Sequence, residues 1–302
     1  MSPPAHRCGF VALVGRPNAG KSTLLNRLVG EKLAIVSPRP QTTRTRITGI
    51  AQLGRAQVVF VDTPGVHEGT GKLAAYMAGT AARALEGVDV VCLVADATRA
   101  PDRADEELLA RLAGCPAPVY CCLNKVDLVR PKSRLLPRIA AYRARLPFKE
   151  VVPVSATEGT NCDRLRDLLV GELPERPADF PAEVLTDQPE TFFVAETVRE
   201  KLFRFTHDEV PYACAVQVGR LVERPGRPGL SVAASIFVEQ ESQKGIVIGK
   251  GGAMLKRIGT AAREDLERFF GVPVHLALRV QVRRKWRTDD RALREFGFRL
   301  TS

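Results

Sequence analysis

The chain has 302 residues, 45% of them hydrophobic, and a net charge of +11. This length exceeds the usual size of a single core, so we expect two domains, and the basic excess indicates a polyanionic partner such as nucleic acid or an anionic lipid surface. The seven cysteines follow no metal-binding spacing and are expected to be small core residues in a reducing cytosol. No apolar run reaches the ~20 residues of a membrane span, and residues 1–7 lack a signal core, so we expect a cytoplasmic protein.

A phosphate-binding loop is predicted at residues 15–22, which read Gly-Arg-Pro-Asn-Ala-Gly-Lys-Ser. The apolar run 10–14 precedes it as a buried strand, and residues 23–29 follow with helical spacing, which is the setting in which G-x-x-x-x-G-K-[ST] binds phosphate. The glycines let backbone N–H groups turn inward, and the helix N-terminus adds unpaired donors. Lys21 is therefore expected to reach the β- and γ-phosphates, and Ser22 to bind Mg²⁺.

The first 172 residues alternate short Val-rich runs with helical patterns. This alternation predicts an α/β domain with a mostly parallel six-stranded sheet and helices on both faces. Ligands of such sheets bind at the carboxyl ends of the strands, where each motif described here is placed. The expected strands are 8–14, 47–53, 57–62, 88–95, 119–124 and 151–155, and the expected helices lie near 21–30, 72–86, 102–113, 133–145 and 162–171.

The second motif, Asp62-Thr63-Pro64-Gly65, ends an apolar strand. A carboxylate at Asp62 can hold Mg²⁺, which prefers oxygen ligands. The N–H group of Gly65 can approach a γ-phosphate, and loss of that phosphate would release the segment 65–72. Taken alone, this tetrapeptide is equally well explained by a Pro-Gly turn.

The third motif, Asn124-Lys125-Val126-Asp127, favours guanine over adenine. Asp127 can accept two hydrogen bonds from one edge of guanine, and adenine lacks that pair of donors. Asn124 can contact the other edge, and the Lys125 stem can cover the base plane. A site built on buried polar pairs rejects the wrong base because a mismatch leaves them unpaired. The fourth motif, Ser155-Ala156-Thr157, can supply backbone N–H groups to the base but is weak by itself.

With these four motifs in this order, the first half is similar to a translation-factor-class GTPase. The resemblance implies that residues 41–46 form the first switch, in which Thr43, or alternatively Thr42, closes over Mg²⁺. Val66 stands where many such GTPases have a Gln that orients water, so a slow intrinsic rate is expected. Asn18 resembles the asparagine of potassium-activated GTPases, which makes stimulation by K⁺ a hypothesis alongside the simpler interpretation of a turn residue.

The predicted ligands are GTP or GDP with Mg²⁺. The residues expected to act in hydrolysis are Asn18, Lys21, Thr43 and Gly65, and the expected Mg²⁺ ligands are Ser22, Thr43 and Asp62. The residues expected to contact the nucleotide are Gly15, Arg16, Pro17, Asn18, Ala19, Gly20, Lys21, Ser22, Thr23, Asp62, Thr63, Pro64, Gly65, Asn124, Lys125, Asp127, Ser155, Ala156 and Thr157.

Residues 173–190 are rich in proline and charge and are expected to link a GTPase domain at 1–172 to a second domain at 191–302. The second domain is expected to place Gly249-Lys250-Gly251-Gly252 between two helices. The other expected elements are a helix at 191–205, strands at 213–222 and 230–238, a helix at 253–270 and a strand at 274–282.

The order helix–strand–strand–helix–helix–strand, with G-x-x-G at the helix junction, is similar to an α+β type II KH domain, in which this loop clamps about four nucleotides. Residues 244–302 hold fourteen Lys or Arg and six Asp or Glu, which supports RNA binding. Trp286 is expected either to pack in the core or to stack on a base. The predicted RNA contacts are Gly249, Lys250, Gly251, Gly252, Arg279, Arg283, Arg284 and Lys285.

The pairing of a GTPase domain with a KH domain, together with Gly-Arg-Pro-Asn-Ala-Gly-Lys-Ser, Gln-Thr-Thr-Arg and Gly-Lys-Gly-Gly, resembles the Era family of bacterial GTPases, of the TrmE-Era-EngA-like class. The resemblance implies binding of small-subunit ribosomal RNA near its 3′ end, a role in maturation of the small ribosomal subunit, and cytoplasmic location with peripheral contact at the inner face of the cell membrane. We expect a monomer in which the nucleotide state gates RNA binding. Two alternatives stay open, namely an RNA-binding protein whose GTPase half is structural, and a membrane-surface GTPase whose basic tail meets anionic lipid.

Overall fold

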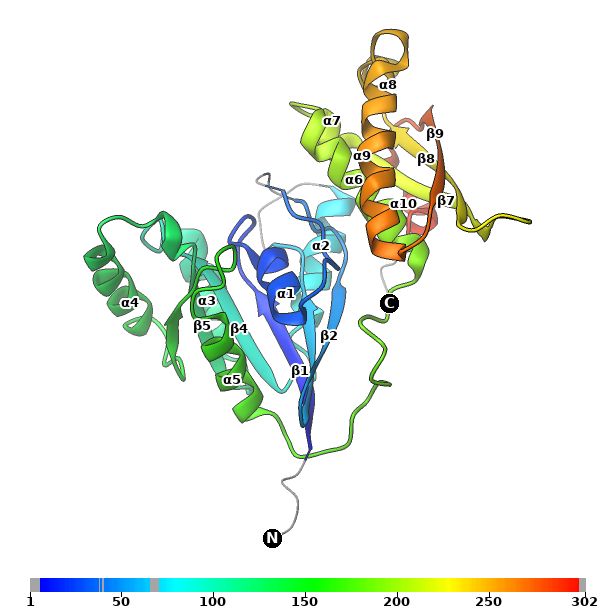
Figure 1. Cartoon of the computed structure of the whole chain (residues 1–302). Coiled ribbons are helices and arrows are strands. Elements are labelled where there is room, and N and C mark those ends of the chain that lie inside the picture. Colours follow the sequence, from blue (N-terminus) through cyan, green and yellow to red (C-terminus); the bar gives the residue numbers. More distant parts are fainter. Residues whose placement is uncertain (1–5, 38, 40, 66–70, 299–302) are drawn as a thin grey trace. The chain divides into compact units, whose positions relative to one another are not determined.

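The computed structural model describes residues 6–37, 39, 41–65 and 71–298 (Figure 1). The chain divides into two compact units, the first formed by residues 1–69 and 77–187 and the second by residues 70–76 and 188–302. Among the helices of these described ranges, none combines the length and the apolar character needed to cross a membrane.

The first unit is an α/β domain built on a six-stranded sheet with the order β2-β3-β1-β4-β5-β6. The strand β2 runs antiparallel to β3, and the other neighbours are parallel, so the predicted mostly parallel sheet is confirmed. The strands are β1 (Arg7–Val14), β2 (Ile47–Leu53), β3 (Ala56–Asp62), β4 (Val90–Asp96), β5 (Val119–Asn124) and β6 (Val151–Pro153). The helices are α1 (Lys21–Val29), α3 (Arg103–Ala113), α4 (Leu135–Arg143) and α5 (Cys162–Glu172), together with α2 (Lys72–Arg83), of which residues 77–83 belong to this unit and residues 72–76 to the second.

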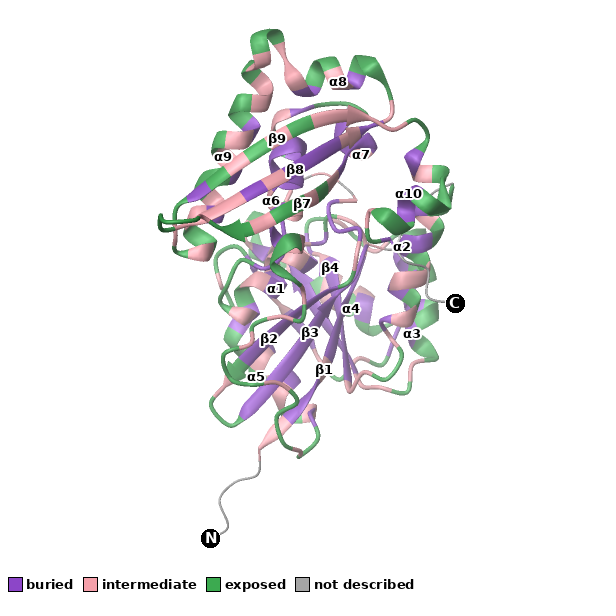
Figure 2. Ribbon diagram, turned by 90° about the vertical axis from the view of Figure 1, so that its right-hand side faces the viewer, coloured by how far each residue is buried: buried purple, intermediate pink, exposed green. Residues whose placement is uncertain are grey.

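Burial explains why these strands are continuous apolar runs rather than alternating ones. Every residue of β3 and β5 is buried, and the strands of this sheet are mostly purple in Figure 2. Strands that are covered on both faces must be apolar on both. Each large apolar side chain buried in this way stabilises the folded state by ~1.5–3 kcal/mol. One core cluster joins the sheet residues Leu93 and Leu123 to Leu109 of α3 and Tyr142 of α4.

The segment 173–187, part of the predicted linker at 173–190, is hydrogen-bonded to the rest of the first unit. The amide of Cys8 donates to the carbonyl of Pro174 at 3.1 Å, and the amide of Ile50 in β2 donates to the carbonyl of Leu185 at 2.8 Å. The side chain of Gln57 accepts from the backbone N–H groups of Asp179 and Phe180 at 2.8 and 3.0 Å. The segment therefore supplies partners to β2, which is an edge strand of the sheet.

The second unit contains a three-stranded sheet with the order β7-β8-β9, in which β7 and β8 are antiparallel and β8 and β9 parallel. Its order of main elements, α6-β7-β8-α8-α9-β9, is the order expected for a type II KH domain. The elements are α6 (Glu190–Phe205), α7 (Val210–Ala213), β7 (Ala215–Glu223), β8 (Leu230–Val238), α8 (Glu241–Ile248), α9 (Ala253–Phe270), β9 (Val274–Val282) and α10 (Asp290–Glu295). The short helices α7 and α10 were not among the elements predicted from the sequence.

Trp286 belongs to the core of the second unit. Its ring is fully buried, and its indole N–H donates to the carbonyl of Ala213 at 2.8 Å. The ring also packs against Phe296 and Phe298, with centroids 5.4 and 6.1 Å away. Of the two alternatives predicted for Trp286, core packing is therefore correct, because a buried ring cannot stack on a base.

Candidate functional site

A cavity of about 430 Å³ lies in the first unit, beside the loop between β1 and α1. Its walls come from the phosphate loop, from residues 35–37 and 41–43, and from the loops after β3 and β5. The residues lining it are Pro17, Asn18, Gly20, Lys21, Ser22, Thr23, Ile35, Val36, Ser37, Gln41, Thr42, Thr43, Gly65, Lys125 and Leu128. Four segments that are far apart in the sequence thus form one concave surface at the carboxyl ends of the strands, where α/β sheets hold ligands.

The side chain of Lys21 is held inside the phosphate loop. It is 6% exposed, and its ammonium group donates to the carbonyls of Gly15 and Arg16 at 3.0 and 2.9 Å. Burial lowers the pKa of Lys21 to about 8, against the opposing attraction of the Asp62 carboxylate. A cation desolvated in this way interacts strongly with any anion that enters the cavity.

Ser22, Thr43 and Asp62 converge on one point. The Ser22 hydroxyl donates to Asp62 Oδ2 at 2.6 Å and lies 2.8 Å from the Thr43 hydroxyl. Asp62 is fully buried, and burial raises its pKa while the charge of Lys21 opposes this. Its other oxygen, Oδ1, has no hydrogen-bond partner among the described residues. An unsatisfied carboxylate oxygen beside two hydroxyls fits a hard cation such as Mg²⁺.

The two threonines of the first-switch sequence differ in their contacts. Thr43 lies beside Ser22, whereas the hydroxyl of Thr42 donates to the carbonyl of Arg39 at 2.7 Å. Both threonines line the cavity. Their hydroxyl contacts favour Thr43 over Thr42 as the metal ligand.

Gly65 is packed against the phosphate loop. A Cβ atom placed there would lie 2.6 Å from the backbone nitrogen of Pro17 and 2.7 Å from its Cα. Any larger residue would have to displace one of the two loops. Val66, from which slow hydrolysis is expected, lies outside the described residues.

Asn124 does not line the cavity; its side chain joins the end of β5 to two loops by hydrogen bonds. Its amide N–H₂ donates to the carbonyl of Ala19 at 2.9 Å, and its amide oxygen accepts from the N–H of Ala156 at 3.0 Å. The phosphate loop, the strand end of β5 and the loop after β6 therefore share one buried side chain. Contact between Asn124 and a purine edge stays a prediction.

Lys125 reaches the cavity, while Asp127 is not one of the residues that line it. The backbone of Lys125 is left-handed, with a φ of 67°, and its ammonium group donates to Asp96 Oδ2 at 2.7 Å. Asp127 is half-buried in the single turn that follows. The two exposed apolar side chains Val36 and Leu128 also line the cavity, and no motif in the sequence singled them out.

The Ser155-Ala156-Thr157 loop is held by a residue that the motifs did not indicate. Arg27 in α1 donates to the carbonyls of Ala156 and Thr157 at 3.1 and 2.6 Å. These three loop residues do not line the cavity, although they are attached to it through Asn124. Arg27 has no local sequence signal, because it is one basic residue in an amphipathic helix.

The Gly249–Gly252 loop of the second unit joins α8 to α9 at an accessible position. Lys250 and Gly251 are exposed, and Gly249 and Gly252 are half-buried. Gly252 begins α9 in the left-handed conformation, with a φ of 80°. A Cβ atom at Gly251 or Gly252 would meet no atom within 4 Å, whereas one at Gly249 would lie 2.7 Å from Cβ of Met254, so the space is open at the Gly251–Gly252 end of the loop.

The four basic residues predicted to contact RNA differ in their exposure and in their contacts within the protein. Arg284 and Lys285 are exposed. Arg279 is exposed on β9 and donates to the hydroxyl of Ser235 at 2.7 Å. Arg283 pairs with Glu295 and lies over the Phe296 ring, so its charge is partly compensated within the protein.

Comparison with known proteins decides the family. The family described as 50S ribosome-binding GTPase matches residues 10–125, and the KH domain family matches residues 209–287. The GTPase Era of Geobacter metallireducens is 50% identical to this chain over 298 residues, covering 99% of the chain and all of that protein. The chain belongs to the Era family of GTPases. The GTPase Era of Lacticaseibacillus paracasei is 46% identical over 293 residues, covering 97% of both chains.

Two solved structures of Era proteins have the same fold. Era from Aquifex aeolicus, as a variant with one substituted residue bound to GDP and AlF4⁻, has a TM-score of 0.94 at 38% identity and covers 97% of this chain and all of its own. A complex of Era with MgGDPNP and nucleotides 1506–1542 of 16S ribosomal RNA has a TM-score of 0.95 at 39% identity, with 98% of this chain and all of that chain covered. The Era assignment confirms the predicted succession of a P-loop GTPase domain and a KH domain.

Proposed function

We propose that this protein binds GTP in the cavity of its first unit, hydrolyses it to GDP and phosphate, and binds small-subunit ribosomal RNA near its 3′ end through its second unit. The main support for the nucleotide site is a group of side chains beside buried Lys21. Ser22 and Thr43 lie there together with the Asp62 oxygen that has no hydrogen-bond partner among the described residues. The Era complex with MgGDPNP and a 16S ribosomal RNA fragment supports both ligand classes. The process that these activities serve is assembly of the small ribosomal subunit.

In this proposal, Lys21 and the N–H groups of the phosphate loop bind the β- and γ-phosphates. Ser22, Thr43 and Asp62 would hold Mg²⁺, which supplies positive charge to the phosphates when it is bound. The N–H group of Gly65 would contact the γ-phosphate. Asp127 would accept hydrogen bonds from the guanine base, and the Lys125 side chain would cover the base plane. Asn124 and the 155–157 loop would support these two residues.

The RNA site that we propose consists of the open Gly249–Gly252 loop and the basic side chains of Arg279, Arg283, Arg284 and Lys285. Backbone near glycine can approach a sugar-phosphate chain closely, and the cations add charge pairing with phosphates. We favour RNA over an anionic lipid surface because a lipid surface needs only charge, whereas the G-x-x-G loop of KH domains also clamps a nucleic-acid backbone. We place the protein in the cytoplasm, with peripheral membrane contact as a secondary association.

Gating of RNA binding by the nucleotide is tested by comparing RNA affinity in the presence of a non-hydrolysable GTP analogue and of GDP. We expect tighter binding with the analogue by about 5- to 100-fold, the usual range of coupling between two sites. By linkage, the RNA must tighten binding of the analogue relative to GDP by the same factor. Equal RNA affinities in the two nucleotide states would remove the gating and leave two independent binding activities.

Potassium stimulation is a hypothesis that rests on the resemblance of Asn18 to the asparagine of potassium-activated GTPases, and Asn18 is exposed and lines the cavity. A monovalent cation bound there would add positive charge beside the phosphates, as an arginine finger does in other GTPases. We expect hydrolysis at least about tenfold faster in K⁺ than in Na⁺ at equal ionic strength. The Asn18→Ala variant should lose this difference, and equal wild-type rates in the two salts would contradict the hypothesis.

A further inference from the structure

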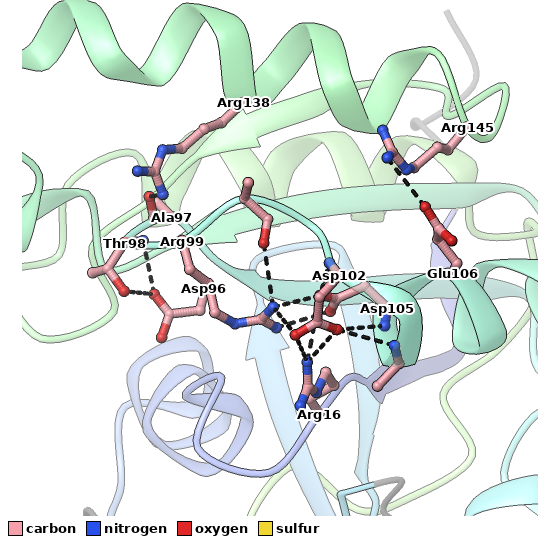
Figure 3. Close-up of polar contacts among 12 residues, drawn as sticks. Arg16, Asp96, Ala97, Thr98, Arg99, Asp102, Asp105, Glu106, Arg138 and Arg145 are labelled. Atoms are coloured by element: carbon pink, nitrogen blue, oxygen red, sulfur yellow. Dashed lines mark hydrogen bonds and ion pairs between the residues drawn. The ribbon is translucent and has the colours of Figure 1, made fainter.

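We infer that the loop between β4 and α3, residues 96–102, positions the two ends of the nucleotide site, with Asp96 orienting Lys125 and Asp102 anchoring Arg16. This inference rests on the nucleotide site proposed above. The loop carries none of the four nucleotide-binding motifs, yet Asp96 at one end contacts Lys125 of the third motif. Asp102 at the other end contacts Arg16 of the first motif (Figure 3).

The Asp96 end of the loop fixes the lysine of the third motif. Asp96 Oδ2 accepts from the Lys125 ammonium group at 2.7 Å, while Oδ1 accepts from the N–H and the hydroxyl of Thr98 at 2.8 and 2.6 Å. Partial burial opposes ionisation, but the hydrogen bonds from Lys125 and Thr98 hold the pKa of Asp96 below its ordinary value. The carboxylate therefore favours its charged form, with both oxygens hydrogen-bonded, and it orients the lysine side chain that lines the cavity.

The Asp102 end of the loop fixes the phosphate loop. One nitrogen of the Arg16 guanidinium contacts both oxygens of Asp102, at 2.6 and 2.5 Å. Asp105 lies 3.6 Å from the same nitrogen, and Arg99 bridges Asp102 and Asp105. The backbone carbonyl of Arg16 accepts from the Lys21 ammonium group at 2.9 Å. A shift of Arg16 would therefore move an acceptor that holds the lysine of the phosphate loop.

Both ends of the loop have further contacts. Arg138 of α4 donates to the carbonyl of Ala97, and Asp102 caps α3 by accepting from the N–H groups of Ala104 and Asp105 at 3.0 and 3.3 Å. Each end of the loop is therefore fixed to a helix as well as to a nucleotide-binding motif. Exposed ion pairs add little to the free energy of unfolding. The role of these contacts is therefore to orient Lys125 and Arg16.

The test uses Asp96→Asn and Asp102→Asn in the full-length chain, with a fluorescent GDP analogue as ligand. Asn is as good a helix cap as Asp, so Asp102→Asn keeps the α3 cap and removes the charge that pairs with Arg16 and with Arg99. The matched control is Glu107→Gln, which removes an exposed carboxylate from α3 whose ion-pair partner is Arg103, outside the cavity. Dissociation of GDP, single-turnover cleavage of bound GTP and melting of the nucleotide-free protein are measured for each variant.

For Asp96→Asn we expect GDP to dissociate about tenfold faster, with cleavage of bound GTP within about twofold of wild type. For Asp102→Asn we expect cleavage to slow about three- to fivefold, with a smaller change in dissociation. Glu107→Gln should match wild type, and all three nucleotide-free variants should melt at the wild-type temperature.

Wild-type kinetics in both Asn variants would overturn the inference. A lowered melting temperature with normal kinetics below the transition would also overturn it, because the contacts would then serve folding alone. If the wild-type protein bound no fluorescent GDP, the proposed nucleotide site would be wrong, and the positioning role would be wrong with it.

Discussion

Replacement of Lys21 by alanine is expected to remove the rise in melting temperature that GDP and Mg²⁺ cause. At saturating GTP, we expect cleavage to be slower by about 100- to 1,000-fold. The ammonium group is buried, hydrogen-bonded to two loop carbonyls and aimed at the cavity, so its whole interaction with phosphate would be lost. No other Lys or Arg lines the described cavity except Lys125, which is engaged with Asp96. The measurement is the rise in melting temperature on addition of GDP and Mg²⁺, together with single-turnover hydrolysis.

Lys149→Ala is the control for the Lys21 experiment. Lys149 is an exposed lysine of the first unit whose ion-pair partner is Glu172, and it does not line the cavity. The control should retain the full stabilisation by GDP, which for a ligand at 100 times its Kd is ~2.7 kcal/mol. Because burying the Lys21 cation is itself costly, Lys21→Ala should fold normally without nucleotide. A normal GDP-induced shift in Lys21→Ala would refute the assignment of the phosphate loop.

Most of the fold could be predicted because buried strands and amphipathic helices leave regular patterns. The strands at 47–53, 119–124, 230–238 and 274–282 have the bounds expected from their apolar runs. Differences occur at ends, as in β6, which stops at Pro153 and not at 155. Short elements such as α7 and α10 were missed because helices of four and six residues are too short to show a period.

The candidate site was predictable where function requires a fixed local spacing. Lys21 and Ser22 belong to one contiguous motif, and the structure places them in the cavity. The contacts of Asp96 with Lys125 and of Arg27 with Ala156 join residues 29 and 129 positions apart. Nothing in the local sequence specifies such partners, because the sheet order decides which loops meet. Trp286 illustrates the same limit, since only tertiary packing distinguishes a core ring from a stacking platform.

The largest expected effect on RNA binding comes from Gly252→Asp. The substitution places a carboxylate on the loop where the RNA backbone is expected to lie, so it adds repulsion and obstructs close approach. We expect affinity for a single-stranded RNA of the small-subunit 3′ region to fall at least about tenfold. Filter binding or fluorescence anisotropy at a fixed, stated salt concentration measures this, and thermal melting followed by far-UV circular dichroism is the check that the second unit is folded.

Gly226→Asp is a closely matched control for that experiment. Gly226 lies in the turn between β7 and β8 with a φ of 66°, against 80° at Gly252, and a Cβ atom at either position meets nothing within 4 Å. Both substitutions add the same charge and the same left-handed strain of about 1–2 kcal/mol, so a difference between them reports on location alone. Because only Gly252 belongs to the G-x-x-G loop, Gly226→Asp should bind RNA almost as wild type does. Equal RNA affinity in the two variants would mean that the strand is bound elsewhere on this basic unit.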